Sequence, residues 1–269
     1  MLLLDRIKWQ ILSCGINISA MYRHLGYQDK RYLQLKKFKN RYQGKRCFIC
    51  ATGPSLTQED VEMLKDEYTI GLNSICAMYP DTWWRPKFYV FQDYPVYEMY
   101  GDWFNKEGKT IVFSGDPLVD YVRGAKIKGK CIRFPLNWAY HCYTMRTGKQ
   151  AYVYFSDDCY EKVYSGYTVT YTAIQLAMYM GFKEIYLLGV DCNYSAGKKN
   201  HFVKMKKEFI RTTQSAKKEC GYQMLAYQKA KEEAERKDVS IYNVTRGGKL
   251  EVFPRKKLEE VLNDDKKKI

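Results

Sequence analysis

The sequence predicts an α/β protein with a doubly wound, mainly parallel, Rossmann-like sheet. Two observations favour this class. From residue 46 onward, short apolar runs alternate with segments of helical periodicity, which is typical of strand–helix–strand units. With 269 residues, 46% of them hydrophobic, the chain can also bury a substantial core. Ligands of such sheets bind beyond the carboxyl ends of the strands, so the residues that follow each strand matter most.

The pattern divides the chain into three parts. Residues 1–45 form a basic helical N-terminal extension. Residues 46–255 form the Rossmann-like domain, with a small lid or insertion at about 137–165. Residues 256–269 form a charged C-terminal tail.

In the extension, Leu4, Ile7 and Ile11 recur at helical spacing and a run of Lys and Arg follows. Two interpretations stay open. The segment lies on an anionic membrane face, or Trp9 and the leucines pack on the core.

The elements of the main domain follow from their composition. Apolar runs predict strands, and amphipathic runs with polar starts predict helices. Strands are expected at 47–52, 68–75 (a strand and loop), 86–93, 109–115, 130–136, 183–191 and 239–245. Helices are expected at 57–65, 169–182 and 222–238.

Composition excludes several classes. No window is long and apolar enough for a membrane span. Charges at Asp5, Arg6 and Lys8 interrupt the first apolar stretch, so a secretory signal is not expected and a cytoplasmic protein is. The nine cysteines argue against a complete disulfide framework, and the single CxxC (Cys47 to Cys50) lies within a strand, which does not suit zinc. The net charge of +15 is compatible with anionic ligands, but no nucleic-acid-binding module is recognisable.

The first predicted strand ends in the turn Ala51-Thr52-Gly53-Pro54-Ser55. Gly53 permits a close backbone approach, Pro54 needs no amide hydrogen, and Ser55 or Thr57 can cap the next helix. A turn of this kind before a helix is a natural phosphate seat. It matches neither the Walker A nor the GxGxxG pattern, and an ordinary Gly-Pro turn is the alternative.

Polar residues follow the other strands as well and open the helix that begins near residue 169. Several polar strand ends in one α/β domain indicate a shared ligand cleft. The candidates are Thr52, Gly53, Pro54, Ser55, Asn73, Gln92, Asp93, Gly166, Thr168, Thr170, Asp191, Asn193 and Tyr194.

Three segments, "FICATGPSL", "GLNSI" and "TYTAIQLAMYMGFKEIYLLGVDCNYS", resemble the bacterial sialyltransferases of glycosyltransferase family 42. They are also similar to the wider MptE-like group, which includes 6-hydroxymethylpterin diphosphokinase. The similarity spans about 46–254. It implies a metal-independent glycosyltransferase without a cofactor, which uses a CMP-sugar donor, CMP-sialic acid or a related CMP-nonulosonate, in bacterial surface polysaccharide or glycoconjugate synthesis.

The resemblance departs at the catalytic base, a histidine that this chain lacks just before its late helix. The chain has only His24, His141 and His201. His201 is the preferred base or phosphate ligand, with Asp191 and Tyr194 beside it, and His141 is a residue that a lid could bring in. A structural histidine is the alternative reading for His201.

Two other functions stay open. An MptE-like diphosphokinase would need ATP and Mg²⁺, with Asp93 and Asp191 as the natural ligands. A catalytically inactive nucleotide-sugar-binding protein is the third. Expected partners are the nucleotide-sugar donor, a glycan or lipid-linked acceptor and, if the extension binds lipid, the anionic inner face of the membrane. A homo-oligomer is compatible with the sequence, and nucleic acid is not expected.

Two further motifs have ordinary alternatives. Asp157 and Asp158 look like a metal-binding pair, but adjacent aspartates are more often solvated. The stretch Thr245 to Gly248 either carries Arg246 to a phosphate or makes a simple turn.

Overall fold

The computed structural model describes residues 2–116, 130–147, 151–193 and 213–264. Its centre is one eight-stranded sheet in which every pair of neighbouring strands is parallel. The strand order is β6-β5-β4-β3-β2-β1-β7-β8. The strands are β1 (Arg46–Cys50), β2 (Thr69–Leu72), β3 (Phe88–Phe91), β4 (Ile111–Asp116), β5 (Cys131–Asn137), β6 (Val163–Tyr164), β7 (Glu184–Leu188) and β8 (Ser240–Asn243).

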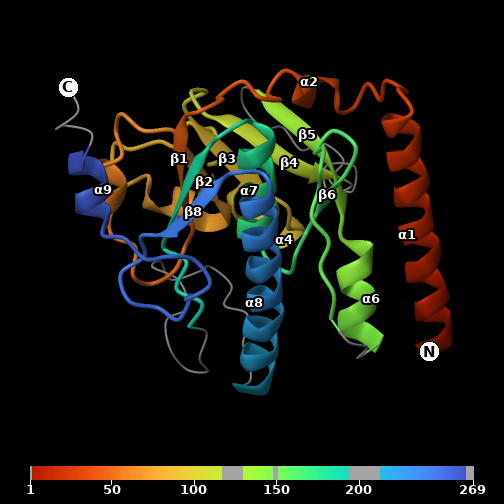
Figure 1. Cartoon of the computed structure of the whole chain (residues 1–269). Helices are drawn as coiled ribbons and strands as arrows, with labels where there is room; N and C mark the ends of the chain where they lie inside the picture. Colours follow the sequence, from red (N-terminus) through yellow and green to blue (C-terminus); the bar gives the residue numbers. More distant parts are fainter. Residues whose placement is uncertain (1, 117–129, 148–150, 194–212, 265–269) are drawn as a thin grey trace.

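Helices cover both faces of the sheet (Figure 1). One face packs against α2 (Leu33–Lys36), α7 (Val169–Tyr179) and α8 (Thr213–Arg236). The opposite face packs against α3 (Gln58–Glu62), the 3₁₀ helix η1 (Asn73–Met78), α4 (Tyr94–Tyr100) and α9 (Leu258–Asp264). The predicted doubly wound Rossmann-like fold is therefore confirmed.

Alternation along β1 explains how one strand serves both layers. Cys47 and Ile49 belong to one hydrophobic cluster, whereas Phe48 and Cys50 belong to the other. The two thiols of the CxxC sequence are thus buried on opposite faces of the sheet. Burial also raises their pKa, because the thiolate would lose its hydration.

The helix termini follow local chemistry. Thr57 caps α3 in a capping box, in which its hydroxyl accepts from the Asp60 amide and the Asp60 carboxylate accepts from the Thr57 amide. Thr168 caps α7 by accepting from the amide of Thr170. Gly181 follows α7 with a φ of 92°, a conformation that glycine adopts readily.

The predicted strands overlap β1 to β5, β7 and β8, and the predicted helices overlap α3, α7 and α8, although α8 begins at Thr213, nine residues earlier than predicted. The elements that were not predicted include η1, α4, α6 (Ala139–Thr147) and the two-residue β6. The last two lie within 137–165, the stretch expected to be a lid or insertion. Residues 258–264, expected within a charged tail, form α9, and its Leu258 and Val261 side chains are buried.

The extension begins with α1 (Leu2–His24), which runs along the edge of the molecule beside α6 (Figure 1). Its inner face is anchored at both ends. Trp9 is buried edge-to-face against Trp138, with ring centroids 5.2 Å apart. Arg23 is buried and donates to the carbonyl oxygen of Glu161 at 2.9 and 2.7 Å. Part of the extension therefore packs on the body of the protein, as one of the two interpretations expected.

Candidate functional site

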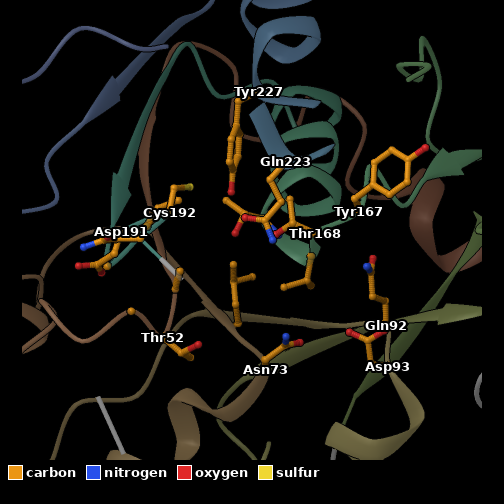
Figure 2. A pocket seen from close by; sticks show the side chains of 18 of the residues that line it. Thr52, Asn73, Gln92, Asp93, Tyr167, Thr168, Asp191, Cys192, Gln223 and Tyr227 are labelled. Carbon is orange, nitrogen blue, oxygen red and sulfur yellow. The ribbon is translucent and has the colours of Figure 1, made fainter. Parts of the chain in front are cut away.

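A cavity of about 260 Å³ opens beyond the carboxyl ends of the central strands. It spans the ends of β7, β1, β2 and β3, which are consecutive in the sheet. The N-terminus of α7 and one face of α8 close it from the other side (Figure 2). β1 has β2 on one side and β7, from far along the chain, on the other, so the cavity lies at the topological switch point, where such folds bind ligands.

Most of the predicted site residues line this cavity. They are Thr52, Gly53, Pro54, Asn73, Gln92, Asp93, Thr168, Thr170, Asp191 and Asn193. Ser55 and Gly166 lie next to it without lining it. His201 and Tyr194 lie outside the described residues.

The turn after β1 is tied to the turn after β7. The Gly53 amide donates to the carbonyl oxygen of Gly189 at 2.8 Å. The Ser55 hydroxyl donates to the Asp191 carboxylate at 2.8 Å. A Cβ atom on Gly53 would lie 1.8 Å from Oδ2 of Asp191, so only glycine fits. The sequence suggested a phosphate seat in this turn, but the donors of Gly53 and Ser55 serve the protein's own groups.

Asp191 is one of the residues that line the cavity (Figure 2). Burial raises the pKa of its carboxyl, and the hydrogen bonds from Ser55 oppose that rise. The loop after β8 braces it from behind: the Lys249 amide donates to the Asp191 carbonyl at 2.7 Å, and Gly248 packs on the Asp191 backbone. Asp191 is therefore held in one position by two separate segments, the turn after β1 and the loop after β8.

The stretch from Thr245 to Gly248 is thus a brace. The Thr245 hydroxyl accepts from the Val190 amide at 3.0 Å. Arg246 forms an ion pair with the buried Asp60 of the α3 capping box. These contacts fit the interpretation of this stretch as a turn, and they do not direct Arg246 to a phosphate.

Asn73 follows β2 and faces the middle of the cavity (Figure 2). Its φ is 45°, in the left-handed region that Asn tolerates better than most residues. Its side-chain oxygen Oδ1 is enclosed, and no group in the described part of the chain donates to it. A buried acceptor without a donor is costly, which indicates that a ligand or water supplies one.

Strained backbone collects around this cavity. Tyr167 and Cys192 also have positive φ, at 62° and 47°, and both line it. Residues held in sparsely populated conformations cluster at functional sites because the surrounding structure must enforce them.

On the β3 side, Gln92 and Asp93 reach the cavity from the strand end. The Thr172 hydroxyl of α7 donates to Oε1 of Gln92 at 2.7 Å and holds that amide in place. Asp93 is exposed as a whole residue, and it makes no capping hydrogen bond to α4 although it occupies the N-cap position. Its carboxyl group lies among protein atoms that displace part of its hydration, which raises its pKa to about 6.

His141 reaches the same cavity from α6, as the lid reading had allowed. Its Nδ1 contacts the Ser165 hydroxyl, and its ring lies 5.2 Å from that of Tyr167. Desolvation lowers the pKa of His141 to about 4, so the imidazole is neutral at physiological pH.

Among the lining residues that sequence reasoning missed are Tyr167, Cys192, Gln223 and Tyr227. Gln223 and Tyr227 lie four residues apart on α8 and therefore share one helix face, a signal that the sequence does contain. Tyr167 stacks on Tyr222 of the same helix, with ring centroids 4.7 Å apart.

The two adjacent aspartates outside the cavity make ion pairs. Asp157 binds Arg236 and Lys237, and Asp158 binds Lys39. Within the described residues, no group of three or more His, Cys, Asp or Glu side chains is arranged to hold a metal ion. In the same part of the chain, no helix has both the length and the apolarity required to cross a bilayer.

Three comparisons relate the chain to known proteins. Among solved structures, the MAf glycosyltransferase from Magnetospirillum magneticum AMB-1 is similar, with 18% identity and a TM-score of 0.48. The match covers 84% of this chain and 37% of that longer one. Comparison with curated proteins gives no match. A family profile described as "6-hydroxymethylpterin diphosphokinase MptE-like" matches residues 21–197, well over half of the chain, and confirms the resemblance predicted from the sequence. The chain belongs to the MptE-like family.

Proposed function

We propose that the protein is a glycosyltransferase that takes its sugar from a nucleotide-activated donor, a CMP-nonulosonate such as CMP-sialic acid. The acceptor is a glycan or lipid-linked glycan of a bacterial surface polysaccharide or glycoconjugate. The observation that carries the proposal is the cavity itself, because the N-terminus of α7 and Asp93 both line it.

The leaving phosphate is assigned to the start of α7. The helix has eleven residues, and its first turn faces the cavity through Thr168 and Thr170. The positive end of the helix dipole stabilises negative charge there. The CMP that departs gains charge as the glycosidic bond breaks, so a fixed positive field lowers that barrier.

The nucleoside is assigned to Asn73 and Asp191. The enclosed Oδ1 of Asn73 accepts a hydrogen bond, as does the Asp191 carboxylate, so both suit the hydroxyl and amino groups of a cytidine. Ser55 and Gly53 act indirectly, because they hold Asp191 in place.

Asp93 is assigned as the base that takes the proton of the acceptor hydroxyl. A pKa of about 6 leaves its carboxylate ionised at pH 7 and closer in basicity to the task than an ordinary aspartate. His141, with a pKa of about 4, is a weaker base, and its Nδ1 is already engaged by Ser165. Because His201 lies outside the described residues, the proposal rests on Asp93.

The family description favours a second function, an ATP-dependent diphosphokinase. This reaction needs Mg²⁺, for which Asp93 and Asp191 are the available carboxylates. They follow β3 and β7, which are three strand spacings apart, or roughly 14 Å at about 4.8 Å per spacing. One ion cannot bridge that span, so each carboxylate would have to hold Mg²⁺ separately. Because of this separation of the two carboxylates, we place the kinase second to the glycosyltransferase.

A panel of nucleotides tests the proposal. Purified protein is melted with CMP, CDP, UDP, GDP or ATP, each with Mg²⁺ and with EDTA, since a ligand that binds only the native state raises Tm. We expect CMP and CDP to raise Tm equally in both conditions. A response to ATP with Mg²⁺ and none to CMP would replace the transferase with the kinase.

A second measurement separates a transferase from an inactive binding protein. CMP release from CMP-sialic acid is followed by chromatography, first with water and then with glycan acceptors. Release above the rate of an Asp93→Asn control supports catalysis. Binding of CMP with identical release by both proteins would identify a binding protein.

A further inference from the structure

The N-terminal helix α1 has two faces of different character. The inner face, with Trp9, Ala20 and Arg23, is buried against the body of the protein. The outer face carries a row of apolar side chains that stay largely exposed. This row, called the α1 seam below, consists of Leu4 (75% exposed), Ile7 (44%), Ile11 (65%), Cys14 (exposed), Ile18 (50%) and Met21 (51%) on α1 and of Leu25 (73%), which directly follows the helix.

Along the whole α1 seam, neighbouring residues of the row are alternately three and four positions apart in the sequence. This is the a/d pattern of a heptad repeat, sustained here over three heptads. The seam is also narrow, and Trp9 and Arg23 occupy the heptad position opposite to it. A strict a/d stripe is typical of a helix that packs along another helix, whereas a membrane-surface helix has a broader apolar face.

The charges beside the seam point the same way. The flanking e and g positions along α1 are Lys8, Gln10, Gly15, Asn17, Tyr22 and His24. Lys8 is the one with a fixed charge, and it lies near one end. Two such helices can approach without repulsion despite the net charge of +15, and an anionic bilayer finds few cations along the seam.

The area is sufficient for a dimer. With the neighbouring Tyr22, which is 55% exposed, the seam presents on the order of 700 Å² per copy, near the roughly 800 Å² that each partner buries in a standard interface. Figure 1 places α1 at the outer edge of the molecule, away from the strand ends that form the cavity, so a partner there leaves the cavity accessible.

We propose that the α1 seam binds the α1 seam of a second copy of this chain, forming a two-helix coiled coil that makes the protein a homodimer. The inference is independent of the proposed function. It replaces the membrane as the occupant of the outer face, and it uses the half of α1 that the body of the protein leaves uncovered.

Oligomeric state is the primary test. Sedimentation velocity of the full chain at about 50 μM is expected to show a dimer, and the double variant Ile11→Glu/Ile18→Glu a monomer with an unchanged circular dichroism spectrum and CMP response. Leu225→Glu, an exposed leucine of α8 that is 46% accessible, is the matched control and should stay dimeric. A monomeric native protein overturns the proposal, as does a dimer that survives the double variant.

Cysteine cross-linking tests which residues meet. Cys14 lies in the seam and is exposed, whereas the other eight cysteines, all within the described residues, are buried or half-buried. In a parallel pair Cys14 faces its own copy, and in an antiparallel pair it faces Ile11 or Ile18 of the second copy. The native chain, Ile11→Cys and Ile18→Cys are therefore oxidised mildly with copper phenanthroline. At least one of these three proteins should form a covalent dimer, and the additional substitution Cys14→Ser should abolish it. No cross-link in any of the three overturns the proposal.

A lipid assay covers the competing occupant. Flotation with vesicles of phosphatidylglycerol and phosphatidylcholine at low salt should leave the native dimer in the soluble fraction. If the native protein instead floats with the vesicles as a monomer, and the double variant does not float, the seam binds a lipid surface and the dimer proposal is wrong.

Discussion

The two sides of the cavity are built in different ways. On the β1–β7 side, the Gly53 amide donates to the Gly189 carbonyl and the Ser55 hydroxyl donates to Asp191. The loop after β8 packs against the Asp191 backbone and holds it from the other side. On the β3–α6 side, Asp93 and His141 keep shifted pKa values, and Asp93 makes no capping bond. The first side fixes a shape, and the second retains groups that can exchange protons. Under the proposed function, the first side recognises the donor and the second side handles the proton.

The largest effect is expected from Gly53→Ala on the fixed side. The new methyl group would meet Oδ2 of Asp191 at 1.8 Å and the Gly189 carbonyl at 2.5 Å, so both turns must move. We expect CMP affinity to fall about a thousandfold or more, which is on the order of 4 kcal/mol. Calorimetric titration with CMP measures it.

Gly221→Ala is the control for this substitution, because a Cβ atom on this residue of α8 would meet no neighbouring group of the described structure within 4 Å. Its affinity should equal that of the native protein. Native affinity in Gly53→Ala would show that the β1–β7 turns do not shape the nucleotide site.

The next effect is expected from Asp93→Asn on the titrating side. Loss of the base should lower the rate of sugar transfer by about 10²- to 10⁴-fold while CMP affinity stays within a few-fold. In the native enzyme, kcat should fall as the pH drops below about 6, because the carboxylate becomes protonated. Rates measured from pH 5 to 8 test this, and His141→Gln should show the same fall of kcat at acidic pH. If that fall disappears in His141→Gln, the histidine is the base.

Asp93→Asn also has a signature in stability. The folded-state pKa lies above the ordinary value of 3.8, so the folded protein binds the proton more tightly and loses stability as the pH rises from about 4 to 6. The asparagine variant should therefore have a higher Tm than the native protein at pH 7 and an equal one below pH 4. A Tm of Asp93→Asn below that of the native protein at pH 7 would contradict a raised pKa of the Asp93 carboxyl.

The smallest effect is expected from Asn73→Ala. Removal of one buried hydrogen bond to the ligand should weaken CMP binding by about 1–3 kcal/mol, or roughly tenfold to a hundredfold. The alanine also strains the backbone, since φ is 45° there. Asn40→Ala is the matched control, because Asn40 has a φ of 55° and lies beside Tyr179 at the far end of α7. Equal CMP affinity in both variants would remove Asn73 from the site.

The sequence was sufficient for the sheet and for most of the cavity lining. Strands such as β1 and β7 are uninterrupted apolar runs, and strand ends are recognisable where polar residues such as Asn73 and Asp93 follow. β6 was not predictable, since two residues carry no periodicity. The occupation of the β1 turn by Asp191 depends on β1 and β7 being neighbours, a tertiary fact that local patterns do not contain.

The inward reach of α8 was hidden for a related reason. Gln223 and Tyr227 mark one helix face, but which way that face points is decided by packing of Ala226 and Ala230 against the sheet. The pKa of Asp93 likewise depends on atoms brought together from distant segments.

The wide spread of the cavity along the chain has a consequence for biogenesis. Its lining begins at Ala51 and is complete only with Tyr227, and every strand pairing that supports it is parallel and joins separate segments. Long-range pairings of this kind form slowly, and a ribosome adds only about 5–20 residues per second. A growing chain therefore carries the β1 turn for roughly ten seconds or more before α8 exists to cover it. During synthesis, ligand cannot stabilise the early strands, and the edge of β1 that pairs with β7 stays unpaired until β7 has been made.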